Sequence, residues 1–287
     1  FDCIEFNADF RIVDSIAEVA LLDMDLNARG HPAESHRLLT DYLEYRGDFA
    51  GLALLDLYRV YFALVRAKVA LLQHSTDDPA LLDTKAYGEA RHYLEIAQRY
   101  CQPRRRFLGI TYGLSGSGKS TAAGKLVEAS GAVRIRSDVE RKRLFGLAPE
   151  ERSEARDNAR LYSTDMSRKT FERLADLAET ILDAGFPVIV DGTFLHRHVR
   201  TDFQDLATRL KVPFVIIHCV TDERKIRDRL RARESSGVSV SEAGIAIMEQ
   251  QRDQLQPLSD SERQLATEVR AGADPDDIWQ SVRSKMQ

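Results

Sequence analysis

The segment Gly113–Ser120, which reads Gly-Leu-Ser-Gly-Ser-Gly-Lys-Ser, restricts what this chain can fold into more than any other. It fits the pattern G-x-x-x-x-G-K-[ST] at every fixed position, with an apolar, β-prone run before it and an amphipathic helical pattern after it. Glycines let the backbone curl so that several N–H groups point at one phosphate, and the following helix adds the partial positive charge of its N-terminus. The segment therefore predicts a phosphate-binding loop between a strand and a helix.

The same segment assigns chemistry to individual side chains. The Lys119 ammonium can reach the β- and γ-phosphates of a nucleotide, and the Ser120 hydroxyl can ligate Mg²⁺. ATP is the expected nucleotide and Mg²⁺ the expected metal. The residues expected around the phosphates are Gly113, Leu114, Ser115, Gly116, Ser117, Gly118, Lys119, Ser120 and Thr121.

Acidic residues follow the next two apolar runs. Asp191 ends the run at 188–190, at the strand end where open α/β sheets bind ligands, so it can hold Mg²⁺ directly or through water. Asp138 follows the strand expected at 132–136, and Arg141, three residues later, faces the same way on a helix. We expect Asp138 to take the proton of an acceptor hydroxyl and Arg141 to hold an anionic or hydroxylated group. The alternative for Asp191 is a helix N-cap or turn residue, and the alternative for Asp138 is a helix N-cap beside a solvated basic face.

Four arginines lie in one predicted helix over 222–233, at positions 227, 229, 231 and 233, just before a Ser/Gly-containing segment at 234–240. On a mobile lid such arginines neutralise the charge of a transferring phosphoryl group. A solvated basic helix face is the alternative.

Two parts are expected along the chain. Residues 1–102 have a mostly helical pattern, whereas residues 103–287 alternate strands with helices and predict an α/β fold, a parallel sheet with helices on both faces. The expected helices of the first part span about 12–26, 33–45, 50–73 and 80–100. The expected strands of the second part span 106–112, 132–136, 187–190, 212–220 and 267–270. One long helix is expected over 154–184.

Charge and composition exclude several classes of protein. Residues 1–102 carry 10 Lys/Arg and 17 Asp/Glu, a net charge of −7, and the remainder carries 31 and 28, a net charge of +3. That mild positive charge suits a phosphate site better than a duplex-DNA binder, so nucleic acid is an unlikely partner. No apolar run approaches the ~20 residues that span a bilayer. The three cysteines lie far apart, which favours free thiols in a reducing cytoplasm.

Three segments together resemble the P-loop kinases of the zeta-toxin and polynucleotide-kinase type: 113–121, 136–141 and 190–194. The resemblance implies that Asp138-x-x-Arg141 serves the acceptor and that Asp191-x-Thr193 lies at the active centre. Arg229 and Arg233 best match the lid arginines of that group. The whole chain resembles bacterial AAA-family ATPases in which an aminoglycoside-phosphotransferase-like domain is fused to such a P-loop domain.

Within that resemblance, residues 1–102 look like part of the phosphotransferase C-lobe, with Asp2 at the metal aspartate and Asp14 at a structural aspartate that begins the next helix. The His-Gly-Asp catalytic loop and the nucleotide-binding N-lobe are absent from this sequence, so we expect this part to act as a scaffold or partner surface. The first residue is Phe1 inside a strand-like pattern, which suggests a fragment of a longer protein.

These patterns lead to one functional hypothesis with two alternatives. The leading hypothesis is a cytoplasmic ATP- and Mg²⁺-dependent phosphotransferase that acts on a hydroxyl of an unidentified acceptor, with Lys119, Asp138, Arg229 and Arg233 as its catalytic side chains. One alternative is a nucleotide-dependent ATPase switch without an acceptor, against which the Asp138–Arg141 pair argues. The other is a polynucleotide 5′-hydroxyl kinase, which the charge makes weaker.

Overall fold

The parallel sheet expected from the alternating pattern is present in the computed structural model, which describes residues 13–73, 84–151, 158–236 and 245–286. Its five strands have the order β2-β3-β1-β4-β5, and every neighbouring pair is parallel. The strands are β1 (Leu108–Tyr112), β2 (Val133–Arg136), β3 (Val188–Asp191), β4 (Phe214–Val220) and β5 (Ala266–Arg270). Because β1 is the middle strand, the loop that follows it begins at the centre of the carboxyl edge of the sheet. The predicted fold class is confirmed.

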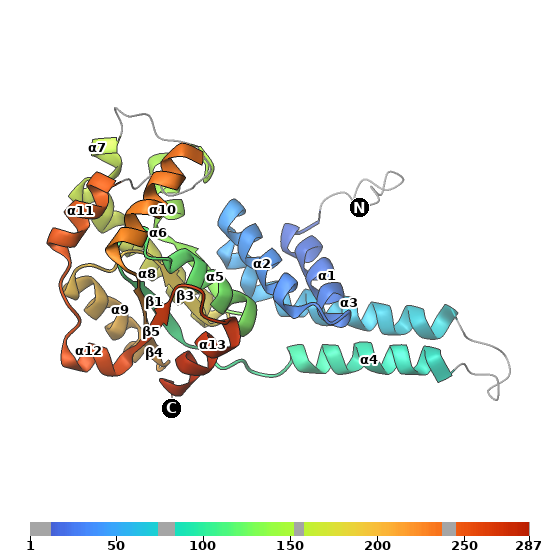
Figure 1. Ribbon diagram of the computed structural model, residues 1–287. Helices are drawn as coiled ribbons and strands as arrows, with labels where there is room; N and C mark the ends of the chain where they lie inside the picture. Colours follow the sequence, from blue (N-terminus) through green and yellow to red (C-terminus); the bar gives the residue numbers. More distant parts are fainter. Residues whose placement is uncertain (1–12, 74–83, 152–157, 237–244, 287) are drawn as a thin grey trace.

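Helices cover both faces of this sheet (Figure 1). On one face, α5 (Lys119–Ser130) and α13 (Pro275–Ser284) pack on Ile189, Val215 and Ile217. On the other face, α8 (Thr164–Asp183) and α9 (Arg197–Arg209) pack on the alternate residues of the same strands. The remaining helices of this part are α6 (Ser137–Phe145), α7 (Asn158–Leu161), α10 (Glu223–Ser236), α11 (Ile245–Gln254) and α12 (Asp260–Leu265).

The first part of the chain is helical, as expected. Its elements are α1 (Ser15–Ala28), α2 (Pro32–Arg46), the 3₁₀ turn η2 (Phe49–Gly51), α3 (Leu52–Gln73) and α4 (Thr84–Tyr100). α2 packs against α5 and β2, while α3 and α4 form a long pair that extends away from the sheet (Figure 1). Leu43 and Phe49 belong to the same hydrophobic core as Leu177 and Phe186. The core is therefore continuous across the boundary expected at residue 102.

Several expectations about elements need correction. Residues 154–157 of the helix expected over 154–184 lie outside the described residues, and the remainder forms two helices, α7 and α8. The break arises because Ser163 has extended backbone angles and its side chain caps α8 by accepting from the Met166 N–H at 3.2 Å. Helix α12 was not expected.

Asp14 caps α1 by accepting from the Ile16 N–H at 3.1 Å. The strand-like start of the sequence, with Asp2, lies outside the described residues.

Candidate active site

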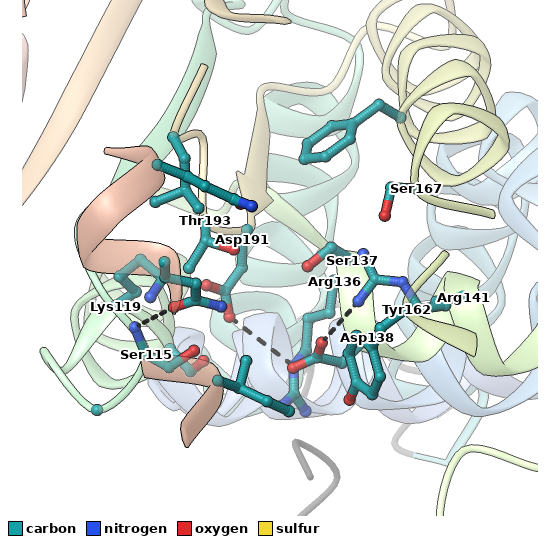
Figure 2. A pocket seen from close by; sticks show the side chains of 18 of the residues that line it. Ser115, Lys119, Arg136, Ser137, Asp138, Arg141, Tyr162, Ser167, Asp191 and Thr193 are labelled. Carbon is teal, nitrogen blue, oxygen red and sulfur yellow. Dashed lines mark hydrogen bonds and ion pairs between the residues drawn. The ribbon is translucent and has the colours of Figure 1, made fainter. Parts of the chain in front are cut away.

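A cavity of about 340 Å³ opens at the carboxyl edge of the sheet, beside the phosphate-binding loop. Five segments line it: the loop and the start of α5, the β2–α6 junction, Tyr162 with the first half of α8, the end of β3 with the residues that follow it, and one side of α11. Figure 2 shows Ser115 and Lys119 at one end of the cavity and Asp138, Arg141 and Tyr162 at the other, with Asp191 between them. The site residues predicted from separate motifs are therefore neighbours in space.

The loop has the backbone form that its glycines allow. Gly113 and Gly116 have φ angles of 144° and 82°, which residues with a side chain rarely adopt. A Cβ atom at Gly113 would lie 2.9 Å from the Cys219 carbonyl oxygen, and one at Gly116 would lie 3.1 Å from Cγ2 of Ile226. The Lys119 ammonium donates to the Leu114 carbonyl at 2.8 Å, so its side chain folds back along the loop.

Asp191 is held at the end of β3 by its neighbour on β1. The Thr111 hydroxyl accepts from the Gly192 N–H at 3.0 Å and lies 3.3 Å from Asp191 Oδ1. Asp191 is only 5 % exposed, and its side chain lines the cavity together with Ser120. His196 occupies the N-cap position of the following helix α9, so Asp191 is a strand-end residue and not a helix cap.

A hydroxyl and one carboxylate suit Mg²⁺. This ion usually keeps several waters and binds through one or two carboxylates together with substrate phosphates. Ser120 and Asp191 therefore fit the metal that the loop implies, and no larger ligand set is needed. Among the described residues there is no group of three or more His, Cys, Asp or Glu side chains that could hold a metal by itself.

Asp138 and Arg141 form a pair on α6. Asp138 Oδ1 and Arg141 Nη1 lie 3.6 Å apart, and the guanidinium lies 5.1 Å from the centre of the Tyr162 ring. The Arg141 side chain is 11 % exposed, which does not fit a solvated basic face. Its buried Nε has no hydrogen-bond partner among the described residues. Helix α6 is capped at Arg136, so Asp138 lies in the first turn and is not the N-cap.

Of the four arginines expected on a lid, Arg229 lies at the phosphate-binding loop. Its Nη1 donates to the Gly116 carbonyl at 3.3 Å, from the helix α10 that packs over the loop. Arg227 is paired with Glu223 and Glu249 instead, each at 2.9 Å. The side chain of Arg233 lies outside the described residues. Thr193 lines the cavity just after β3.

A residue that the sequence did not indicate also reaches the loop. The Ser115 N–H donates to Oε1 of Gln251 on α11 at 2.9 Å. α11 carries no motif, and glutamine is common on helix surfaces, so no local pattern marks this residue.

A buried ion pair supports the loop that contains Thr193. Arg200 on α9 is 1 % exposed and its Nε donates to Glu262 Oε1 at 2.6 Å. Its Nη1 also donates to the carbonyls of Phe194 and Leu195 at 3.0 and 3.1 Å. Arg200 thus fixes the backbone just beyond the end of β3.

The helical part also reaches the site through Glu44 on α2. Glu44 accepts from Arg134 Nε at 2.6 Å and lies 3.7 Å from Arg136 Nη1. Arg136 lies in turn 3.8 Å from Asp191 Oδ2. Burial raises the pKa of Glu44, although both arginines act in the opposite direction.

With this geometry established, comparison with known proteins identifies the family. The family model described as an AAA domain (AAA_33) matches residues 108–258, just over half of the chain. The chain belongs to this family. Its matched part is the parallel sheet with the phosphate-binding loop after the central strand, and the match begins at β1 and ends beyond α11. The match does not include the helical part, so the likeness of residues 1–102 to a phosphotransferase C-lobe stays a prediction.

Two similar curated proteins are the uncharacterized proteins Rv2004c of Mycobacterium tuberculosis and Mb2027c of Mycobacterium bovis. Each is 31% identical to this chain over 245 residues, which are 85% of this chain and 48% of that protein. The chain therefore spans about half the length of the curated relatives it matches.

Among solved structures, a putative kinase from Chloroflexus aurantiacus is similar with a TM-score of 0.49 and 22% identity, over 64% of this chain and 100% of that one. A gluconokinase from Sinorhizobium meliloti gives 0.43 and 17%, over 64% and 93%. The APS kinase CysC of Mycobacterium tuberculosis gives 0.43 and 18%, over 64% and 98%. In the described part of this chain, none of the helices has the length and apolar character to cross a membrane.

Proposed function

We propose that the chain is an ATP-dependent phosphotransferase of the zeta-toxin and polynucleotide-kinase type, which moves the γ-phosphoryl group of ATP to a hydroxyl of an acceptor. One observation carries the proposal: the phosphate-binding loop and the Asp138–Arg141 pair line the same cavity. A nucleotide switch needs the phosphate-binding loop, but it does not need a carboxylate and a guanidinium at the opposite end of the cavity.

The proposed roles follow from these positions. Lys119 and the loop amides other than that of Ser115, which donates to Gln251, hold the β- and γ-phosphates, and Arg141 holds the acceptor. Asp138 takes the proton of the acceptor hydroxyl as the hydroxyl oxygen forms a bond to the γ-phosphorus. At the same time the bond from the γ-phosphorus to the β-phosphate oxygen breaks, and ADP is released. Arg229, and Arg233 on the same helix, stabilise the charge of the transferring group. Most of the rate comes from positioning and from charge stabilisation.

Ser120 and Asp191 are the residues that would hold Mg²⁺. When bound, the ion neutralises charge on the nucleotide phosphates. We further propose that residues 1–102 act as a scaffold for this site, because Glu44 contacts the arginines of β2 from the helical side.

The test is transfer of label from γ-³²P-ATP into a cell metabolite extract, with wild type, Asp138→Asn and Asp165→Asn. Asp165 is an exposed aspartate on α8 that is ion-paired with Arg168, so it controls for loss of a surface carboxylate. Asp138→Asn should lower transfer by about 10²- to 10⁴-fold, and Asp165→Asn should not change it. Wild-type transfer by Asp138→Asn would disprove its role as the base.

The same experiment separates the alternatives. A nucleotide switch releases ADP and free phosphate and labels no metabolite. A polynucleotide 5′-hydroxyl kinase labels added oligonucleotides in preference to metabolites. Either result would replace the proposed function.

A further inference from the structure

Gln251 joins α11 to the phosphate-binding loop by a direct hydrogen bond. The Ser115 N–H donates to Gln251 Oε1 at 2.9 Å, and both residues line the cavity. The helix is anchored on the same side, because Met248 is fully buried in a small core with Ile226 and Leu230 of α10. Gln251 is therefore held between two fixed elements and is not a loose surface side chain.

The hydrogen bond also determines which way the Gln251 amide faces. A backbone N–H can only donate, so the atom that meets it must be the carbonyl oxygen of the side chain. The –NH₂ group of the same amide, with two donors, then faces away from the Ser115 nitrogen. No hydrogen bond from it to another described residue is present, and Gln251 lines the same cavity as Asp138.

We propose that Gln251 donates an N–H hydrogen bond to the phosphoryl group as it passes from nucleotide to acceptor. This inference rests on the proposed function. It adds one hydrogen-bond donor to the transferring phosphoryl group, Gln251, which no sequence motif predicted. The equatorial oxygens of that group carry charge in the transition state, and donors fixed in advance stabilise it most. Ser115 supplies that fixation by holding the other end of the amide.

A neutral donor is suited to this position. The cavity is lined by three cations, Lys119, Arg136 and Arg141, and by the carboxylates Asp138 and Asp191. A further cation here would add positive charge to a cavity that already holds three cations. An amide instead adds a donor at the transferring group without adding charge.

A readout that needs no acceptor tests the proposal. Aluminium fluoride with MgADP mimics the transferring phosphoryl group, and a fluorescent ADP reports both binding and release. The variants are Gln251→Ala, Gln251→Glu and, as the control, Asp253→Ala, whose side chain is 75% exposed on the same helix. Thermal unfolding of each variant checks that the fold is intact.

Gln251→Ala should bind MgADP within about twofold of wild type but release it at least about tenfold faster from the aluminium fluoride complex, because a donor to the transferring group is lost. Gln251→Glu should release it faster still, since a carboxylate repels the fluoride anion. Asp253→Ala should match wild type in both measurements.

Three results would overturn the inference. Tighter binding of MgADP by Gln251→Ala would mean that Gln251 competes with the phosphates for the Ser115 N–H. An unchanged release rate from the trapped complex would mean that Gln251 does not touch the transferring group. Failure of wild type to trap MgADP would overturn the inference and the proposed function together. Normal trapping without any labelled acceptor would overturn the proposed function alone.

Discussion

Replacing Arg200 with methionine tests whether one buried ion pair holds the β3–α9 loop in place. Methionine keeps most of the volume and removes the charge and all donors. Glu262 would then lose its cationic partner and keep only the Ser259 N–H, and the carbonyls of Phe194 and Leu195 would lose the donor that Arg200 provides. The site is affected because these two residues follow Thr193 directly.

The magnitude follows from burial. Arg200 and Glu262 have side chains that are 1% and 7% exposed, so removal of one partner leaves an uncompensated buried carboxylate. Breaking such a pair costs about 3–5 kcal/mol. Arg209→Met on the same helix is the matched control, because Arg209 also binds a glutamate, Glu179, but is 59% exposed. An exposed pair contributes about 0–1 kcal/mol.

The assay is urea unfolding at pH 7, followed by circular dichroism. We expect Arg200→Met to lower the free energy of unfolding by about 3–5 kcal/mol and Arg209→Met by less than about 1 kcal/mol. Adding Glu262→Gln to Arg200→Met should restore part of the loss, because it removes the buried charge. A loss below 1 kcal/mol for Arg200→Met, or a double variant no more stable than the single, would refute the reasoning.

Three further predictions concern charge and burial. Glu44→Gln should raise the Mg²⁺ concentration needed for tight ATP binding, because Arg136 is then left with Asp191 as its carboxylate neighbour; a Mg²⁺ titration measures this. Burial lowers the pKa of His36 from 6.5 in the folded chain. Below about pH 6.5 the unfolded chain therefore binds more protons than the folded chain, and the free energy of unfolding should fall as the pH drops. His36→Gln should reduce that fall, measured by urea titrations at pH 7.5 and 5.5. Burial raises the pKa of the Cys219 thiol to about 12, so Ellman's reagent at pH 8 should modify it only after unfolding.

The sequence predicted those parts of the site that depend on short stretches of neighbouring residues. The loop Gly113–Ser120 needs positive φ angles at its glycines, and only a few sequences allow this, so the motif determines the geometry. Asp138 and Asp191 were found because each follows a strand of a parallel sheet, and all such ends meet at one edge. Strands β1, β3 and β4 were found for a similar reason, since buried parallel strands form continuous apolar runs, whereas the edge strands β2 and β5 alternate buried residues with more exposed ones.

The other parts of the site depend on contacts between residues that are far apart in the sequence, and no local pattern indicates such contacts. Gln251 meets Ser115 across 136 residues of chain, and Glu262 meets Arg200 across 62. Helix α12 did have a local signal, since Ser259 and Glu262 form a capping box, but its six residues are too short for a helical period to show. The break between α7 and α8 was missed because Ser163 fits a helical pattern and caps at the same time.

The boundary expected at residue 102 separates a helical part from an α/β part. The contacts at the site indicate that these two parts do not have separate functions. Glu44 comes from the helical part, yet it is a carboxylate partner of both arginines of β2. Arg136 lies between Glu44 and the proposed metal ligand Asp191, 3.7 and 3.8 Å away, so the two carboxylates share one cation. Any change in how α2 packs on β2 therefore changes the charge that Asp191 faces. In this chain the helices are part of the electrostatics of the site, and a P-loop half cut out at residue 103 would lack a carboxylate that the intact chain supplies.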